Sequence, residues 1–457
     1  MKRSTKKVFL LIPTLLACMN IFAEYNTFGI PDSTEIRKQL IDSYFNCKTE
    51  ELENKTDTIY TNDIGQKFQV SVEKSDEEYQ ICIVPERTVE MKKYGNQNVE
   101  TVSIYDKTEK GSWILFRNAD SGNAEKIRIY LNSADDVFLE FHSEGTKTLA
   151  DMIIEGDVAS LSVPMGIRFQ RLYSSSFQEI MNWTKNSLPW NYVLIYKDQY
   201  NDSLVMINEI TKMQKVVENT PYACYNQENQ LCSYLTGKKL ELTDEKGNVV
   251  EPVKGRKYLS DAGFLKWIID SITGVYTDSI IPIEDLTEST VVFDETGKNG
   301  VLSKSYSLTF SLDWCRNLAY ICHESKSTAL YGIDKNQVDV NYNYFICHYS
   351  DKKTVSPYYK DTGYEIRNLK SLLYVLAATE PSNFYLCAVK QHSSLRPDEF
   401  VFADCVAIFP YFDSEGNFNY KILKGNTEIS LEEFADLYRN SFVHLERVKC
   451  SKYLLFQ

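Results

Sequence analysis

The sequence predicts an α+β protein in two parts: an antiparallel β-sandwich-like domain, followed by a domain of helices and an antiparallel sheet. From about residue 57 to 172, apolar and polar residues alternate with a period of two, which is typical of strands with one buried face. Helical patterns return at 176–185 and 203–218. Beyond about 220, candidate helices precede a group of strands, and this order indicates an α+β domain.

The first domain is predicted to span residues 24–175 and to open with a helix at 32–45. Asp32 and Ser33 are favoured helix caps, and the residues behind them place an apolar stripe on one helical face. Short strands then follow, separated by turn residues such as Asn118–Gly122. Strands of this length with frequent turns predict a sandwich or a barrel.

The second domain is predicted to span 221–457, after a helical connector at 176–220. Ser430 and Glu433 have the spacing of a capping box ahead of a short helix. The turn-rich stretch 274–310 is expected to be a long surface excursion. The other expected elements are helices at 261–273, 311–325 and 366–378, and strands at 384–390, 401–411, 418–424 and 442–449.

Residues 1–23 have the pattern of a secretory signal peptide. Four basic residues precede an apolar run from Val8 to Cys18, and the segment ends on the small residue Ala23. The prediction is therefore cleavage after Ala23 and a periplasmic or extracellular location. Leu15–Cys18 also resembles a bacterial lipobox, and in this alternative Cys18 is lipidated and anchors the chain to a membrane.

Charge and cysteine content narrow the classes of partner. The chain has 50 Lys and Arg against 63 Asp and Glu, a net charge of −13, which argues against nucleic acid and anionic membrane surfaces as partners. No apolar run after the signal segment is long enough to cross a membrane. Most of the eleven cysteines lie in apolar strings and are expected to be buried free thiols, while any disulfides cannot be assigned.

The segment Tyr258–Asp270 reads YLSDAGFLKWIID and resembles the nucleophile segment of the NlpC/P60 cell-wall peptidases, a papain-like family. In that family the pattern is Asp-Cys-Ser-Gly-Phe followed by an amphipathic helix. A cysteine at a helix N-terminus has its thiolate stabilised by the helix dipole, and a histidine from the sheet then completes the nucleophile pair.

A second segment resembles the histidine strand of the same family, which reads His-Val-Gly/Ala-Ile-Tyr. Here residues 405–409 read CVAIF, and a turn and another strand follow at 413–418. Residues 100–450 as a whole look like large bacterial envelope proteins in which a β domain precedes an NlpC/P60-like core. The resemblance therefore implies a papain-like second domain, with the helix after Asp261 packed against the strand that carries Cys405.

The catalytic residues that the resemblance implies are missing. Asp261 stands at the cysteine position, and Cys405 stands at the histidine position, or Asp404 if the strand is shifted by one residue. A carboxylate cannot replace a thiolate in attack on a peptide carbonyl, and the base is absent as well. Ser260 and Asp261 are favoured helix caps, so Asp261 is expected to start the helix, and Cys405 is expected at the edge of a cleft.

Other candidate chemistry is weaker. Cys322-His323 and Cys347-His348 could supply four metal ligands, but adjacent residues point in different directions, so no metal site is expected. A relocated nucleophile pair, such as Cys387 with His392, remains an alternative. The sequence has no Gly-rich phosphate loop and no Gly-x-Ser-x-Gly motif, and no cofactor is expected.

Together these observations predict an exported, non-catalytic envelope protein with a binding or scaffolding role near peptidoglycan. Its expected partners are peptidoglycan peptides or another envelope protein. The alternative is an active cell-wall peptidase or amidase that uses a relocated cysteine and histidine.

Overall fold

The computed structural model shows a mixed α+β chain with antiparallel sheets, as the sequence predicts. The chain divides into two compact units. The first contains residues up to 134, 138–150 and 162–195, and the second contains 135–137, 151–161 and 196–457. The structure describes residues 29–92, 99–133, 136–291, 308–326, 335–344, 347–348, 354–355, 357–394 and 398–457. The predicted signal segment, including Cys18 and Ala23, lies outside these ranges.

The main divide falls between residues 195 and 196, inside the predicted connector. Helix α4 (Phe177–Thr184) belongs to the first unit and helix α5 (Asn201–Gln214) to the second. The predicted helix at 203–218 ends early, because a short strand, β11 (Val217–Asn219), follows α5. No helix in the described ranges is long and apolar enough to span a bilayer.

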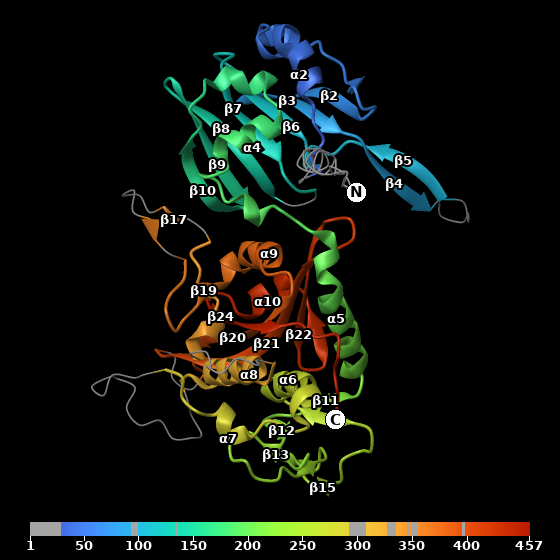
Figure 1. Cartoon of the computed structure of the whole chain (residues 1–457), viewed down its shortest axis with the longest axis vertical. Helices are drawn as coiled ribbons and strands as arrows, with labels where there is room; N and C mark the ends of the chain where they lie inside the picture. Colours follow the sequence, from blue (N-terminus) through green and yellow to red (C-terminus); the bar gives the residue numbers. More distant parts are fainter. Residues whose placement is uncertain are drawn as a thin grey trace, which may run out of the picture. The chain divides into compact units, whose positions relative to one another are not determined.

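Most strands of the first unit belong to one eight-stranded sheet, ordered β1-β2-β3-β6-β7-β8-β9-β10 (Figure 1). The predicted two-sheet sandwich is therefore wrong. The strands are β1 (Thr58–Thr61), β2 (Lys67–Lys74), β3 (Glu78–Pro85), β6 (Trp113–Asn118), β7 (Ala124–Tyr130), β8 (Val137–Glu144), β9 (Lys147–Ile154) and β10 (Asp157–Pro164). The end of β9 and most of β10 fall in residues 151–161, which are grouped with the second unit. Strands β4 (Arg87–Lys92) and β5 (Val99–Ile104) form a separate ribbon.

A helical layer packs on this sheet where the sandwich prediction placed a second sheet. The ring of Phe45 lies 5.2 Å from Trp113 of β6 and 5.1 Å from Tyr173. A period-two pattern specifies that one face of a strand is buried, but not what covers it. The elements of this layer are α2 (Thr34–Leu40), the π-helical turn η2 (Ile41–Phe45), α3 (Thr49–Leu52) and the 3₁₀ helices η3 (Phe169–Ser174) and η4 (Trp190–Tyr192).

The second unit contains a six-stranded antiparallel sheet, ordered β19-β24-β20-β21-β22-β23 (Figure 1). The sequence predicts four of these strands. Three of the predictions, at 401–411, 418–424 and 442–449, agree with the structure to within one residue at each end. The strands are β19 (Tyr364–Glu365), β20 (Asn383–His392), β21 (Phe400–Phe412), β22 (Phe418–Lys424), β23 (Thr427–Ile429) and β24 (Phe442–Lys449).

Helices cover both faces of this sheet. Ala407 and Phe409 of β21 share a buried core with α6 (Asp261–Thr277) and α8 (Phe310–Lys326). On the opposite face, Phe412 lies 5.0 Å from Tyr374 of α9 (Leu369–Thr379). Strand β21 is therefore buried on both faces, which explains its nearly continuous apolar sequence.

Smaller elements surround this core. Helix α6 continues to Thr277, and α7 (Ile283–Leu286) follows, so part of the predicted excursion at 274–310 is helical, while 292–307 lies outside the described residues. Helix α10 (Leu431–Leu437) begins with the predicted capping box of Ser430 and Glu433. The remaining elements are η5 (Lys197–Tyr200), β12 (Ala223–Tyr225), β13 (Leu231–Ser233), β14 (Leu242–Thr243), β15 (Val249–Val250), β16 (Lys257–Leu259), η6 (Lys335–Val338), β17 (Cys347–His348), β18 (Thr354–Val355) and η7 (Ile366–Asn368).

Candidate functional site

The first feature of the candidate site is the start of helix α6. Ser260 is the N-cap, and its hydroxyl oxygen accepts a hydrogen bond of 3.0 Å from the backbone N–H of Gly263. Asp261 is the first helical residue, where the positive end of the helix dipole favours a carboxylate. The predicted helix start and its cap are therefore confirmed. Helix α6 also packs against β21, the strand that carries Cys405, as the sequence predicts.

Two carboxylates at this site share one lysine. The Nζ atom of Lys424 lies 2.9 Å from Asp261 Oδ2 and 2.6 Å from Asp404 Oδ2. Lys424 also donates a hydrogen bond of 2.8 Å to the hydroxyl of Tyr438, which in turn donates to Asp404. The start of α6, strand β21 and the end of β22 thus meet in one ion-pair cluster, which consists of Asp261, Asp404, Lys424 and Tyr438.

The charges of the ion-pair cluster are set by burial and by mutual contact. Burial raises the pKa of Asp261, Lys424 lowers it, and the neighbouring Asp404 raises it again, with a net upward shift. Burial alone would lower the pKa of Lys424, but Asp404, Tyr438 and Asp261 outweigh it and raise this pKa. Lys424 is therefore protonated at neutral pH and cannot serve as a general base.

Asp261 is also enclosed on its other side. Its Oδ1 atom is buried and has no hydrogen-bond partner among the described residues. A Cβ atom at Gly425 would come within 2.8 Å of this oxygen. The absence of a side chain at Gly425 therefore makes space for the carboxylate. The side chains of Asp261 and Lys424 are only about one-fifth exposed. Oδ2 of Asp261 is thus engaged by the lysine and Oδ1 is buried.

Cys405 does not lie at the edge of a cleft, and that part of the prediction is wrong. Its side chain is 2 % exposed and belongs to the core shared by α6 and α8. Tyr234 packs against this same core. The ring of Tyr234 stacks on Phe310 at 4.8 Å and lies 5.6 Å from Trp314. These aromatic side chains therefore belong to the core that buries Cys405.

Among the side chains that the structure describes, no cysteine and histidine come together as a relocated pair. The nine cysteines whose side chains the structure describes are buried free thiols, and none of them has a hydrogen bond to a described histidine. Cys387 and His392 lie five residues apart along β20, about 16 Å at the rise of a strand, and the ring of His392 packs at 4.1 Å on Phe400. Of the four Cys and His side chains considered as metal ligands, that of Cys322 is buried and that of His323 is exposed, and those of Cys347 and His348 are not described.

A second polar cluster contains Arg316 of α8, His444 and Glu446 of β24, and Asp339. The sequence does not predict this cluster. Asp339, His444 and Glu446 each offer an atom within 4.8 Å of the others, a grouping that could hold a metal ion. However, Arg316 donates to both carboxylate oxygens of Asp339, at 3.0 and 2.7 Å, and its Nη2 lies 3.4 Å from His444 Nε2. The guanidinium group already supplies the cation that these buried groups need. The cluster thus fits a structural ion pair better than a metal centre.

Glu446 is the most unusual group of this second cluster. It is fully buried, its Oε1 lies 2.7 Å from His444 Nδ1, and its Oε2 has no partner among the described residues. Burial, and then the charge of Asp339, raise the pKa of Glu446 well above its ordinary value. Burial also lowers the pKa of His444, so both groups are held in their neutral forms.

We expect the variant Glu446→Gln to be more stable than the wild type by a margin that widens as the pH rises. The folded-state pKa of Glu446 lies above its unfolded value. Its contribution to stability is therefore present below the unfolded pKa and is lost as the pH rises through the folded pKa. Glutamine keeps the shape of the neutral acid at every pH. Urea unfolding of both proteins between about pH 5 and pH 8 measures the margin; a margin that is constant or narrows would contradict this explanation.

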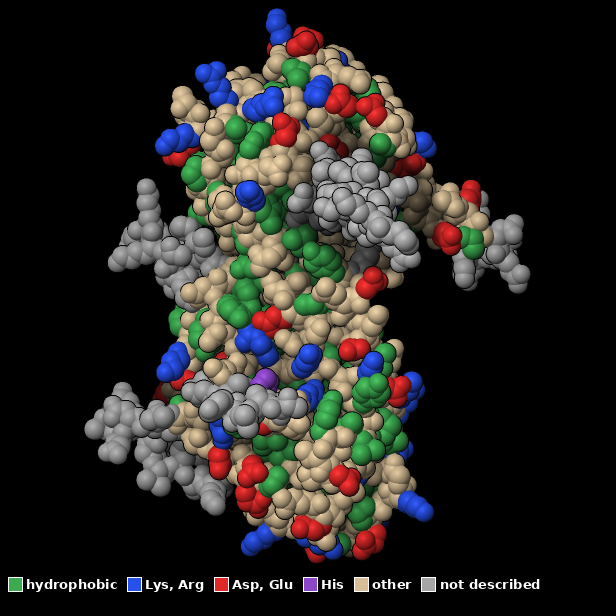
Figure 2. Space-filling model, in the orientation of Figure 1, with side chains coloured by type: hydrophobic (Ala, Val, Ile, Leu, Met, Phe, Trp, Pro, Cys, Tyr) green, Lys and Arg blue, Asp and Glu red, His purple; other side chains and the backbone are tan. Residues whose placement is uncertain are grey.

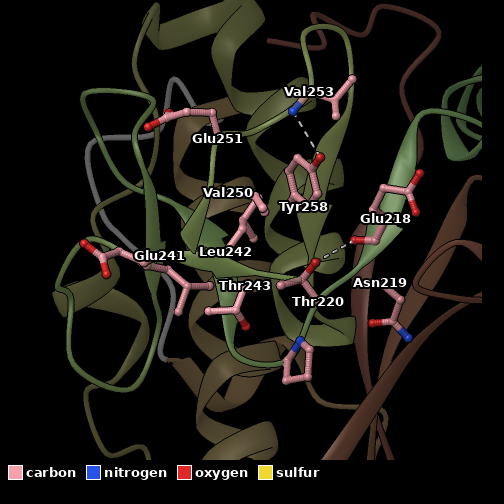
Figure 3. Close-up of a pocket in the computed structure, with 12 residues that line it drawn as sticks. Glu218, Asn219, Thr220, Glu241, Leu242, Thr243, Val250, Glu251, Val253 and Tyr258 are labelled. Atoms are coloured by element: carbon pink, nitrogen blue, oxygen red, sulfur yellow. Dashed lines mark hydrogen bonds between the residues drawn. The ribbon is translucent and has the colours of Figure 1, made fainter. Parts of the chain in front are cut away.

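An open pocket of about 650 Å³ lies beside the strands that lead into α6. Strands β11 and β16 pair in parallel, and Tyr258 of β16 is two residues ahead of the Ser260 cap. Figure 3 shows Leu242, Val250 and Tyr258 in the middle of this pocket, with Glu241 and Glu251 on one side. The hydroxyl of Tyr258 accepts a hydrogen bond of 3.1 Å from Val253 N, which fixes the ring. The pocket therefore combines an aliphatic and aromatic floor with an acidic rim.

A family comparison matches the N-terminal part of the chain. Residues 26–192 match the family model described as "Domain of unknown function (DUF8515)", a segment that includes most of the first unit and ends with η4. No curated protein and no solved structure matches the chain. The candidate site lies wholly outside the matched segment.

Proposed function

We propose that this protein is an exported, non-catalytic protein of the bacterial envelope, whose second unit is a degenerate NlpC/P60-like domain with a binding role near peptidoglycan. One observation carries the proposal. The start of α6 meets β21 and β22, and in the family resembled here the equivalent helix start carries the nucleophile. In this chain the ion-pair cluster of Asp261, Asp404, Lys424 and Tyr438 fills that place.

The chemistry of the ion-pair cluster supports the absence of catalysis. Cysteine peptidases need a thiolate and a neighbouring base that takes up its proton. Here Lys424 pairs with both carboxylates and balances one of their two charges. The pKa of Lys424 is raised by these partners, and burial raises the pKa of Tyr438, so neither Lys424 nor Tyr438 can act as a base at neutral pH. The alternative function, an active peptidase with a relocated Cys/His pair, finds no such pair in the described part of the chain.

Export is inferred from residues 1–23, with cleavage after Ala23, or with lipidation at Cys18 as the alternative. Figure 2 shows Lys and Arg interspersed with Asp and Glu on the visible face of the molecule. This mixed distribution and the net charge of −13 favour a peptide or protein partner over a phosphate backbone.

The pocket beside α6 supports a peptide ligand. Its rim carries Glu241 and Glu251, both exposed, and these carboxylates suit the amine groups of a peptide. Its floor offers Leu242, Val250 and the fixed ring of Tyr258 for apolar contact. We infer that peptidoglycan peptides bind at this pocket and not at the filled position of Asp261.

Co-sedimentation with purified peptidoglycan sacculi tests the binding role. We expect the wild type to pellet with sacculi and the Glu241→Gln/Glu251→Gln double variant to pellet several-fold less, since each lost charge removes a rim contact. Glu245→Gln is the matched control, because Glu245 is exposed on the same hairpin but does not line the pocket. Equal pelleting of the double variant and the control would overturn the assignment of the pocket, and a wild type that stays in solution would overturn the binding role.

A further inference from the structure

A pair of cysteines lies directly beside the candidate site, in the hairpin of β12 and β13. Cys224 and Cys232 are opposite each other across the two antiparallel strands, and their sulfur atoms are 3.7 Å apart. Both side chains are buried, at 0 % and 1 % exposure. Two thiols at this separation are in contact, so the fold already brings together the two sulfur atoms that a disulfide would join.

The backbone around the pair has the spacing that a disulfide requires. Hydrogen bonds from Asn226 N to Gln230 O and from Tyr234 N to Tyr222 O lie two residues to either side of the cysteines. Hydrogen-bonded pairs recur every two residues in an antiparallel ladder, so the two cysteines also form such a pair, with Cα atoms about 5.5 Å apart. This value lies inside the usual Cα separation of disulfides. Rotation of the side chains can close the bond without movement of the strands.

We propose that Cys224 and Cys232 are the site of a disulfide bond that locks this hairpin. With glutathione disulfide as the oxidant, the thiolate of one cysteine attacks the glutathione disulfide and releases one glutathione thiolate. The thiolate of the second cysteine then attacks the mixed disulfide and releases the other. The protein loses two hydrogens, and one glutathione disulfide becomes two glutathione molecules.

The location of the pair gives the bond a structural consequence. The carbonyl oxygen of Ala223, next to Cys224, accepts hydrogen bonds of 3.0 Å from both the backbone N–H and the hydroxyl of Ser260. A lock on the hairpin therefore also fixes the cap of helix α6, where the ion-pair cluster begins. This inference goes beyond the proposed function. An oxidising compartment would supply the oxidant in the cell, but the pairing itself is a property of the folded chain.

Peptide mapping of the purified full chain tests the pairing. Both cysteines lie in one tryptic peptide, residues 216–238, because no lysine or arginine separates Lys215 from Lys238. After equilibration with glutathione disulfide and denaturation in iodoacetamide, we expect this peptide unalkylated and lighter by two hydrogens. The same treatment after reduction should give the doubly alkylated peptide.

Thermal unfolding gives an independent readout. We expect oxidised wild type to melt roughly 5 °C above reduced wild type, since the bond closes a short loop in the unfolded chain. The Cys224→Ala/Cys232→Ala variant should show no shift between the two states. Cys450→Ala should keep the shift, because its buried thiol contacts Ser203 and not another cysteine.

Two results would overturn the proposal. One is a doubly alkylated 216–238 peptide from folded, oxidant-treated protein. The other is a linked peptide that joins Cys224 or Cys232 to a different cysteine. Because the protein is purified and the oxidant is supplied, the outcome does not depend on export or on peptidoglycan binding.

Discussion

The variant Gly263→Ala should lower the free energy of unfolding of the second unit by about 3 kcal/mol or more. Gly263 lies in the first turn of α6, and a Cβ atom there would come within 2.1 Å of the carbonyl oxygen of Ala223. That oxygen cannot move easily, because it accepts two hydrogen bonds from Ser260. Helix α6 would have to shift away from the β12–β13 hairpin. Urea unfolding followed by the fluorescence of Trp267 and Trp314, both in the second unit, measures the loss.

Gly274 provides the matched control in the same helix. A Cβ atom at Gly274 would meet Gln457 and Leu455 only at ordinary contact distances of 3.8 and 3.9 Å. Because alanine favours a helix over glycine, Gly274→Ala should leave stability unchanged or raise it by up to about 1 kcal/mol. If both variants lower the free energy of unfolding by the same amount, the close contact between α6 and the hairpin is not the cause of the loss in Gly263→Ala.

The variant Lys424→Met should destabilise the second unit by about 3 kcal/mol at neutral pH. Removal of the cation leaves the half-buried carboxylates of Asp261 and Asp404 facing each other without a counter-charge. Lys421→Met is the matched control, because Lys421 lies on the same strand and forms a more exposed ion pair with Glu428. We expect this control to change stability by about 0.5 kcal/mol at most.

The deficit of Lys424→Met should shrink in acid. The pKa of Asp261 is already raised in the wild type, and loss of Lys424 removes the group that lowers it. A carboxylate with a raised folded-state pKa contributes stability below its unfolded pKa and loses that contribution as the pH rises. Urea unfolding at about pH 7 and about pH 4 therefore should give a smaller difference from wild type at the lower pH. A deficit that is independent of pH, or no larger than that of Lys421→Met, would argue against the ion-pair cluster as a charged unit.

Local signals explain what the sequence could predict. The cap at Ser260, the apolar face of α6 and the capping box at Ser430 depend on neighbouring residues, and the structure has all three. The strands at 418–424 and 442–449 likewise follow from their own patterns and their turn residues.

Long-range contacts explain what the sequence could not predict. Strand β21 is apolar on both faces and carries an irregularity where its pairing with β20 shifts, so alternation could not assign the face of Cys405. Lys424 is the last residue of its strand, a position where an exposed lysine is common. Its neighbours in the sequence do not indicate that it pairs with two carboxylates. Arg316 lies within an ordinary helical pattern, although it is 1 % exposed and pairs with Asp339. Such partners are set by tertiary packing alone.

Digestion of purified muropeptides by the purified mature chain is the most direct test of the central claim, that the second unit is catalytically inactive. Chromatography with mass detection should show the same muropeptides before and after incubation, because Asp261, paired with Lys424, stands where the nucleophile would lie, and the thiol of Cys405 is buried in the core. Treatment with iodoacetamide should change nothing. Release of amidase or endopeptidase products that iodoacetamide abolishes would contradict the account and would show that a cysteine elsewhere in the chain acts as the nucleophile.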